Sequence, residues 1–169
     1  KELDCKMVYI STDYVFDGCG HKPYTEDMSV CPTNVYGRTK LAGEKALFAE
    51  CENAIIVRTS WLYSSYGNNF VKTMLRLGRE RDELNVIFDQ VGTPTYAADL
   101  AQTILTIIAE KERVRGVYHF SNEGVCSWYD FAKEIASIAQ HNQCDIRPCR
   151  SGEFPTKVIR PSYSVLDKS

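Results

Sequence analysis

The chain has 169 residues, of which 44% are hydrophobic and 25% charged, and its formal net charge is −2. These values are typical of a globular chain with one packed core, and they argue against disorder and against nucleic-acid binding through a basic surface. No apolar run approaches the roughly 20 residues of a spanning helix, and the start lacks the layout of a signal peptide, so we expect a cytoplasmic protein.

The seven cysteines predict reduced thiols rather than a disulfide framework. Their number is odd, and they are scattered without a Cys-x-x-Cys pair, which suits a cytosolic protein. Neither the cysteines nor the three histidines form a pattern of metal ligands, so we predict no metal site.

The first part of the chain predicts two buried strands separated by a loop and a helix. The strands are expected at residues 6–10 and 54–58. Gly, Pro and acidic residues predict a loop over 17–33, and the helix is expected over 35–50, with Thr33 or Asn34 as its N-cap.

The second part alternates helices with strands in the same way. The predicted helices end near residue 79 after a cap at Asn68 or Asn69, span 97 to about 110, and span 128 to about 140; the predicted strands cover 85–88 and 116–120. From residue 146 onward the prolines predict an irregular tail. Strands separated by helices indicate an α/β fold with a mainly parallel sheet covered on both faces.

Polar and aromatic residues follow the predicted strands where each one ends. Thr12 and Asp13 come after the first strand, Trp61 follows the second, and Tyr36 opens the helix between them. Ligands of open parallel sheets bind outside the carboxyl ends of the strands. We therefore expect these groups to face one crevice.

Tyr36 and Lys40 have a spacing that suits acid catalysis. Residues four apart share one helix face, and an ammonium group favours a nearby phenolate, so the tyrosine can give up a proton and recover it. Reduction of a carbonyl needs such a donor, and the hydroxyl of Thr12 can polarise the same oxygen. The alternative reading is that the pair arises by chance, that Thr12 is a strand-end hydrogen bonder and that Trp61 belongs to the core.

Six motifs carry a resemblance over almost the whole chain. In order they are ISTDYVFDG, PTNVYGRTKLAGE, VRTSWLYSSYGNNFVKTML, DQVGTPTYAADLA, GVYHFSNEGVCSWYDFAKEI and RPSYSVL. Together they resemble the dTDP-4-dehydrorhamnose reductase family of the extended short-chain dehydrogenases/reductases. The resemblance implies the C-terminal part of a doubly wound Rossmann-type parallel sheet, over 1–66 and about 97–122. It also implies a small α/β substrate-binding domain, over about 67–96 and 123–169.

The resemblance also implies roles for the strand-end residues. Tyr36 matches the catalytic acid, Lys40 the lysine that tunes it and holds the nicotinamide ribose, and Thr12 the threonine that completes the group. Asp13 matches a substrate-contacting position and Trp61 the tryptophan beside the sugar. The implied reaction reduces the 4-keto group of dTDP-4-dehydro-L-rhamnose with NADPH or NADH, giving dTDP-L-rhamnose for polysaccharide biosynthesis.

The sequence departs from the family at its start. A Gly-x-x-Gly-x-x-Gly turn normally receives the cofactor pyrophosphate, and this sequence has none. We therefore expect an N-terminally truncated chain that lacks the main cofactor-binding motif. Such a chain should be inactive alone and should leave one edge of the sheet unpaired. Homodimer formation is an open expectation, and nucleic acid and membranes are not expected partners.

Five further residues are weaker candidates for the nucleotide or diphosphate of the substrate: Gln90, Thr93, Arg147, Arg150 and Arg160. The alternative is that the DQVGTPT motif shapes a turn and that the arginines are solvated or ion-paired. Two other functions stay open, namely a non-catalytic NADP-binding regulatory subunit, and a reductase or epimerase of another nucleotide sugar.

Overall fold

Three parallel strands form the larger sheet of the computed structural model, which describes residues 5–109, 115–141, 143–154, 156 and 158–169. The strands are β1 (Met7–Thr12), β2 (Ala54–Thr59) and β7 (Gly116–His119), in the order β1-β2-β7. β2 is buried along its whole length. Within the described residues, β1 pairs with β2 alone.

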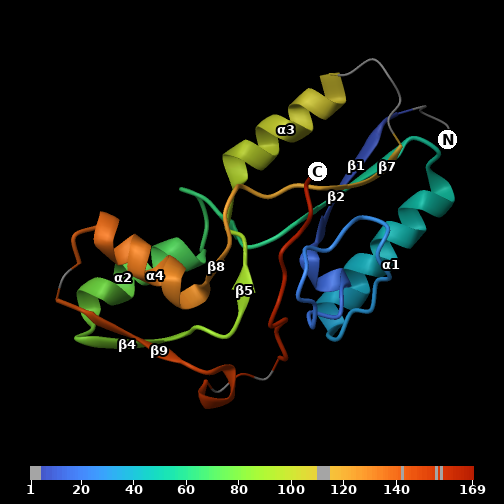
Figure 1. The fold of residues 1–169 in the computed structure, drawn as a ribbon. Coiled ribbons are helices and arrows are strands. Elements are labelled where there is room, and N and C mark those ends of the chain that lie inside the picture. Colours follow the sequence, from blue (N-terminus) through green and yellow to red (C-terminus); the bar gives the residue numbers. More distant parts are fainter. Residues whose placement is uncertain (1–4, 110–114, 142, 155, 157) are drawn as a thin grey trace.

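Two helices cover opposite faces of this sheet (Figure 1). On one face, Leu100 of α3 (Ala97–Ala109) packs against Ile55 of β2 in a buried cluster. On the other, α1 (Val35–Glu50) approaches the ring of Tyr9 of β1. Successive side chains of a strand point to opposite faces, so one strand serves both helices. The predicted α/β sheet is confirmed.

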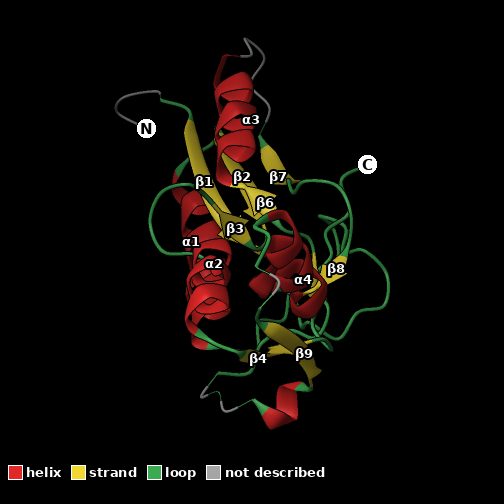
Figure 2. Ribbon diagram, turned by 90° about the vertical axis from the view of Figure 1, so that its left-hand side faces the viewer, coloured by secondary structure: helices red, strands yellow, loops and turns green. Residues whose placement is uncertain are grey.

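A second group of elements lies beside the first and has its own core (Figure 2). β4 (Glu83–Ile87) pairs in parallel with β9 (Asp145–Cys149), and the helices α2 (Phe70–Glu80) and α4 (Trp128–Ile138) pack against them. The buried residues of this cluster are Val86, Ala132, Cys144 and Ile146.

The prediction that the chain is irregular from residue 146 was wrong, because β9 occupies residues 145–149. Pro148 misled the prediction, since proline lacks the N–H that a central strand needs. Among the described residues β9 pairs with β4 alone, and the backbone groups of Asp145 and Cys149 bond on the β4 side, so Pro148 faces the other side and its missing donor costs no ladder hydrogen bond. The strand expected at 85–88 also begins earlier, at Glu83.

Short strand pairs and turns complete the fold. They are β3 (Leu62–Tyr63) with β6 (Thr95–Tyr96), β5 (Val91–Gly92) with β8 (Cys126–Ser127), and the 3-10 turns η1 (Asp13–Val15) and η2 (Ser151–Glu153). The C-terminal segment then returns to the first group of elements, where Leu166 forms an isolated parallel β-bridge with Tyr24.

The predicted helices agree with the structure to within one or two residues at their ends. α1 has the predicted bounds, and both α1 and α2 have a predicted cap. The side chain of Asn34 accepts a hydrogen bond from the backbone N–H of Gly37, and that of Asn69 accepts one from the backbone N–H of Lys72. The expected end of α3 near Glu110 lies outside the described residues. In the described part of the chain, no helix is long and apolar enough to cross a membrane.

Candidate active site

Five of the predicted site residues line one cavity of about 510 Å³. Thr12 and Asp13 come from the end of β1, Trp61 follows β2, and Tyr36 and Lys40 come from the first two turns of α1. The cavity lies at the carboxyl ends of β1 and β2, where parallel sheets bind ligands. Of the weaker candidates, Arg160 also lines this cavity, and Gln90 lines a different one.

Close packing at the start of α1 places Tyr36 at the cavity. A side chain on Gly37 would overlap the carbonyl oxygen of Tyr14, so glycine lets the helix touch η1 there. The ring of Tyr36 meets that of Tyr14 edge to face at 5.5 Å, and Tyr36 is 52% exposed. Among the contacts of the described residues, the Tyr36 hydroxyl has no hydrogen bond, so it is available to a ligand.

Lys40 contacts β1, and Thr12 is the last residue of that strand. The Lys40 Nζ donates to the backbone oxygen of Ile10 at 2.5 Å and lies 4.3 Å from the centre of the Tyr9 ring. The Thr12 hydroxyl is buried and donates to Asp13 Oδ1 at 2.8 Å. An ammonium group has three donors, so Lys40 keeps two for a ligand.

Asp13 is a buried acid with an unsatisfied oxygen. Its Oδ2 has no hydrogen-bond partner among the described residues. Burial raises the pKa of Asp13 to about 7, against the lowering effect of the hydrogen bond from Thr12. A carboxyl group that titrates near neutral pH can either donate to a ligand hydroxyl or accept from one.

Two tryptophans form one wall of the cavity. Trp61 stacks on Trp128 from α4, with ring centres 3.5 Å apart and planes 8° from parallel. The backbone of Trp61 has a φ of 47°, which is strained for a non-glycine residue. Gly92 leaves room for the indole, since a Cβ there would lie 2.6 Å from it. Sequence reasoning missed Trp128, although it lies in one of the quoted motifs.

A second cavity of about 390 Å³ adjoins the first, because Trp128 and Arg160 line both. Its wall is mainly apolar and comes from α2 and β4, with Phe154. Gln90 also lines it and is 4% exposed, with its side-chain nitrogen 2.9 Å from the hydroxyl of Ser151. A flat apolar group could lie here, with the amide of Gln90 as a polar contact.

The remaining weak candidates lie away from both cavities. The Thr93 hydroxyl is buried and donates to the backbone oxygen of Gly124. Arg147 is 55% exposed and pairs with Glu83 and Asp145. Arg150 is exposed and opens η2. In the described part of the chain, no group of three or more His, Cys, Asp and Glu residues could hold a metal ion.

Comparison with known proteins gives consistent matches. The family model described as "RmlD substrate binding domain" matches residues 1–169. The chain is 43% identical to the dTDP-4-dehydrorhamnose reductase of Escherichia coli (strain K12) over 176 residues, covering 98% of this chain and 58% of that protein. It is 42% identical to the spore coat polysaccharide biosynthesis protein SpsK of Bacillus subtilis (strain 168), covering 97% of this chain and 56% of that protein.

A solved structure agrees in fold as well. The dTDP-4-dehydrorhamnose reductase of Bacillus anthracis str. Ames, in complex with NADP, superimposes with a TM-score of 0.92 at 46% identity, covering 99% of this chain and 58% of that one. The chain therefore spans somewhat more than half the length of the relatives it matches.

Proposed function

Because the chain belongs to the RmlD substrate binding domain family, we propose that it carries the catalytic and substrate-binding part of a dTDP-4-dehydrorhamnose reductase. The observation that carries the proposal is the shared cavity of Tyr36, Lys40, Thr12 and Trp61 at the ends of β1 and β2. A carbonyl group in this cavity would meet an acid, a cation and a hydroxyl donor together.

The proton chemistry follows from groups that the chain itself supplies. Tyr36 donates a proton to the 4-keto oxygen, and the positive charge of Lys40 stabilises the phenolate that remains. When Asp13 is protonated it can donate to Thr12, which frees the Thr12 hydroxyl to polarise the same oxygen.

The residues present fit the ribose side of a nicotinamide cofactor. Lys40 has donors to spare beyond its bond to Ile10, and the hydroxyl of Tyr36 is open to the cavity. NADPH or NADH, when bound, supplies the hydride for the carbonyl carbon. Lys40 and Tyr36 would hold it by its ribose hydroxyls.

The two adjoining cavities suggest how a nucleotide sugar would lie. The sugar occupies the first cavity beside Trp61, and the base and deoxyribose occupy the more apolar second cavity near Gln90. Arg160 lines both, so its guanidinium can bind the diphosphate that joins the two parts.

We also propose that the two groups of elements are two domains with different ligands. Residues 1–66 and about 97–122 form the remainder of the NAD(P)-binding domain, and about 67–96 and 123–169 form the substrate-binding domain. The separate cores support this division, since the cluster around Val86 and Ile146 shares no residue with the one around Ile55 and Leu100. The C-terminal segment crosses back to the first group.

The test is a fusion that joins this chain to the part of the E. coli reductase that it does not match. With dTDP-4-dehydro-L-rhamnose present, this completed enzyme should oxidise NADPH. Tyr36→Phe should lower the turnover about 100-fold or more, the usual contribution of a general acid. Tyr66→Phe, which alters an 85% exposed tyrosine outside both cavities, is the matched control.

The outcomes separate the competing functions. Unchanged turnover in Tyr36→Phe would show that the acid is assigned wrongly. NADPH binding without turnover would favour a non-catalytic regulatory subunit. Turnover with a different 4-keto sugar nucleotide alone would favour another reductase or an epimerase.

A further inference from the structure

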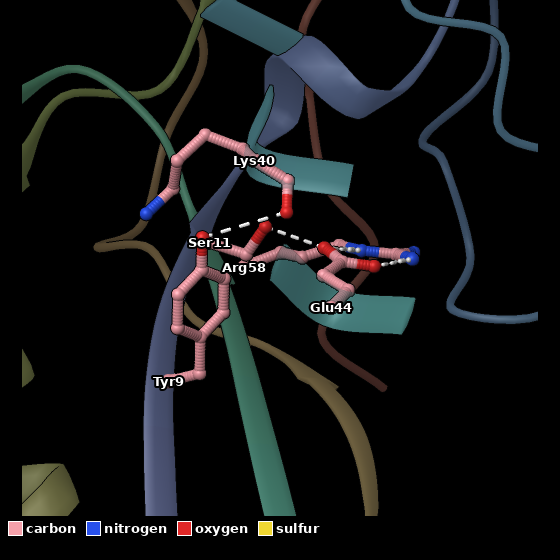
Figure 3. Close-up of polar contacts among 5 residues, drawn as sticks. All are labelled: Tyr9, Ser11, Lys40, Glu44 and Arg58. Carbon is pink, nitrogen blue, oxygen red and sulfur yellow. Dashed lines mark hydrogen bonds and ion pairs between the residues drawn. The ribbon is translucent and has the colours of Figure 1, made fainter. Parts of the chain in front are cut away.

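A buried ion pair joins α1 to the sheet beneath the candidate active site (Figure 3). Arg58 of β2 donates to Glu44 of α1 through two parallel contacts, Nε to Oε1 at 3.0 Å and Nη2 to Oε2 at 2.8 Å. The Ser11 hydroxyl of β1 donates to the same Oε1. Glu44 and Arg58 are 3% and 4% exposed. Three elements therefore meet at one carboxylate.

Glu44 lies on the same face of α1 as the candidate catalytic pair. It follows Lys40 by one helical turn and Tyr36 by two. Lys40 contacts the backbone of Ile10, and Glu44 contacts Ser11, the next residue of β1. Thr12 follows directly. The face of α1 that bears Tyr36 is thus held at two successive turns against the strand that ends in Thr12.

Apolar packing does not fix the rotation of α1 as firmly. The fully buried residues of this fully described helix are Gly37 and Glu44, and its larger apolar side chains are only partly buried, with Leu41 against the cluster that contains Val15 and Leu166. An apolar contact tolerates small rotations, whereas a bidentate guanidinium–carboxylate pair fixes both distance and direction. Since replacing a buried ion pair with apolar side chains is often neutral or stabilising, stability alone does not account for this one.

We propose that Glu44 and Arg58 are positioning residues for the reductase chemistry. The pair sets the rotation and height of α1, so that Tyr36 and Lys40 face Thr12 across the cavity. This inference rests on the proposed function, because it assigns the pair a task in that reaction.

The kinetic test uses the completed enzyme with Arg58→Lys and, separately, Glu44→Gln. Arg58→Lys keeps the charge but loses the two-point contact. We expect kcat to fall at least about tenfold, because small misplacements of catalytic groups are costly, while the KM for the nucleotide sugar stays within about twofold. Arg76→Lys makes the same substitution in an exposed ion pair with Glu80 and should leave both constants unchanged.

A second control separates positioning from stability. Leu100→Ala removes buried contacts between α3 and β2 and should lower the melting temperature without moving α1. If Leu100→Ala lowers kcat as much as Arg58→Lys at an equal loss of melting temperature, the pair is merely structural. A kcat that is unchanged in both pair variants would also overturn the proposal.

Hydrogen exchange in the 169-residue chain gives a readout that needs no activity. In Arg58→Lys, the amides of α1 should exchange faster while those of α4 keep the wild-type rate. Equal changes in both helices, or none in α1, would overturn the positioning role. If the completed wild-type enzyme is inactive, the proposed function fails, but this measurement still decides whether the pair holds α1.

Discussion

At the scale of single residues, Asp13 connects the geometry of the candidate active site with pH. Its burial disfavours the charged carboxylate, so the folded chain holds this proton to a higher pH than the unfolded chain does. Since Asp13 accepts the Thr12 hydrogen bond, its charge state also decides which way that bond runs. The same proton therefore affects both stability and chemistry.

Asp13→Asn should flatten the pH dependence of stability. Below the ordinary pKa of 3.8 both states are protonated, and above about 7 neither is. Between these values only the folded state holds the proton, so the wild type loses up to about 1.4 kcal/mol per pH unit from this group. In urea unfolding from pH 4 to 8, the free energy of unfolding of the Asn variant should therefore rise relative to that of the wild type up to pH 7. A difference that does not vary with pH would contradict this.

The sequence could predict the placement of Thr12, Asp13, Tyr36, Lys40 and Trp61 because each depends on local rules. Strand ends and the i, i+4 spacing on a helix are short-range features. Trp128 could not be predicted, because its stacking on Trp61 depends on how a distant helix packs. The second cavity near Gln90 likewise exists only once α2 and β4 are assembled.

At the scale of elements, two glycines show how closely α1 approaches its neighbours. A side chain on Gly37 would overlap the backbone of Tyr14, which cannot move without displacing η1. One on Gly43 would overlap the end of the Tyr9 side chain, which can swing away. Both positions have ordinary helical geometry, so the substitutions differ mainly in what they displace.

Gly37→Ala should cost stability and turnover, whereas Gly43→Ala should be nearly neutral. In both variants, the higher helix propensity of alanine should stabilise α1 by about 1 kcal/mol. At Gly37 the clash should outweigh this gain, with a net loss of about 1 to 3 kcal/mol, and should shift Tyr36 as well. Urea unfolding and the kcat of the completed enzyme measure the two effects. Equal stability for both variants would show that α1 can move away from η1 freely.

The predictability of an element depends on whether its signal is local. α1 has an asparagine cap and many residues of high helix propensity, and the sequence predicts both of its ends. β9 is formed through pairing with β4, more than fifty residues earlier, and the proline within it hides the pattern. Such strands can be recognised only when the partner is known.

At the scale of the whole molecule, the proposed function assigns to this chain one side of a cofactor-binding site. Under the proposed function, Tyr36 and Lys40 in the first cavity provide ribose contacts, and the sequence contains no Gly-x-x-Gly-x-x-Gly turn for the pyrophosphate. The α/β class was predictable at this scale, because alternating strands and helices permit few other folds. The division into two domains remains a prediction.

The 169-residue chain should therefore bind NADPH weakly. Calorimetric titration should give no isotherm in the micromolar range, because the pyrophosphate and adenosine contacts supply much of the affinity in Rossmann folds. The fusion with the unmatched part of the E. coli reductase is the positive control. Micromolar binding by the chain alone that is lost in Lys40→Ala would contradict the expectation.

The return of the C-terminal segment bears on how the molecule folds. Tyr24 exchanges backbone hydrogen bonds with Val165 and Asp167, and the Ser162 hydroxyl reaches the backbone of Gly18 across a separation of 144 residues. Contacts between such distant segments form late, because they close a long loop of chain. During synthesis, the loop around Tyr24 must wait for its partner to leave the ribosome. Until then, the buried cluster of Val15, Phe16, Tyr24 and Leu166 lacks Leu166, so the folding intermediate exposes apolar surface there.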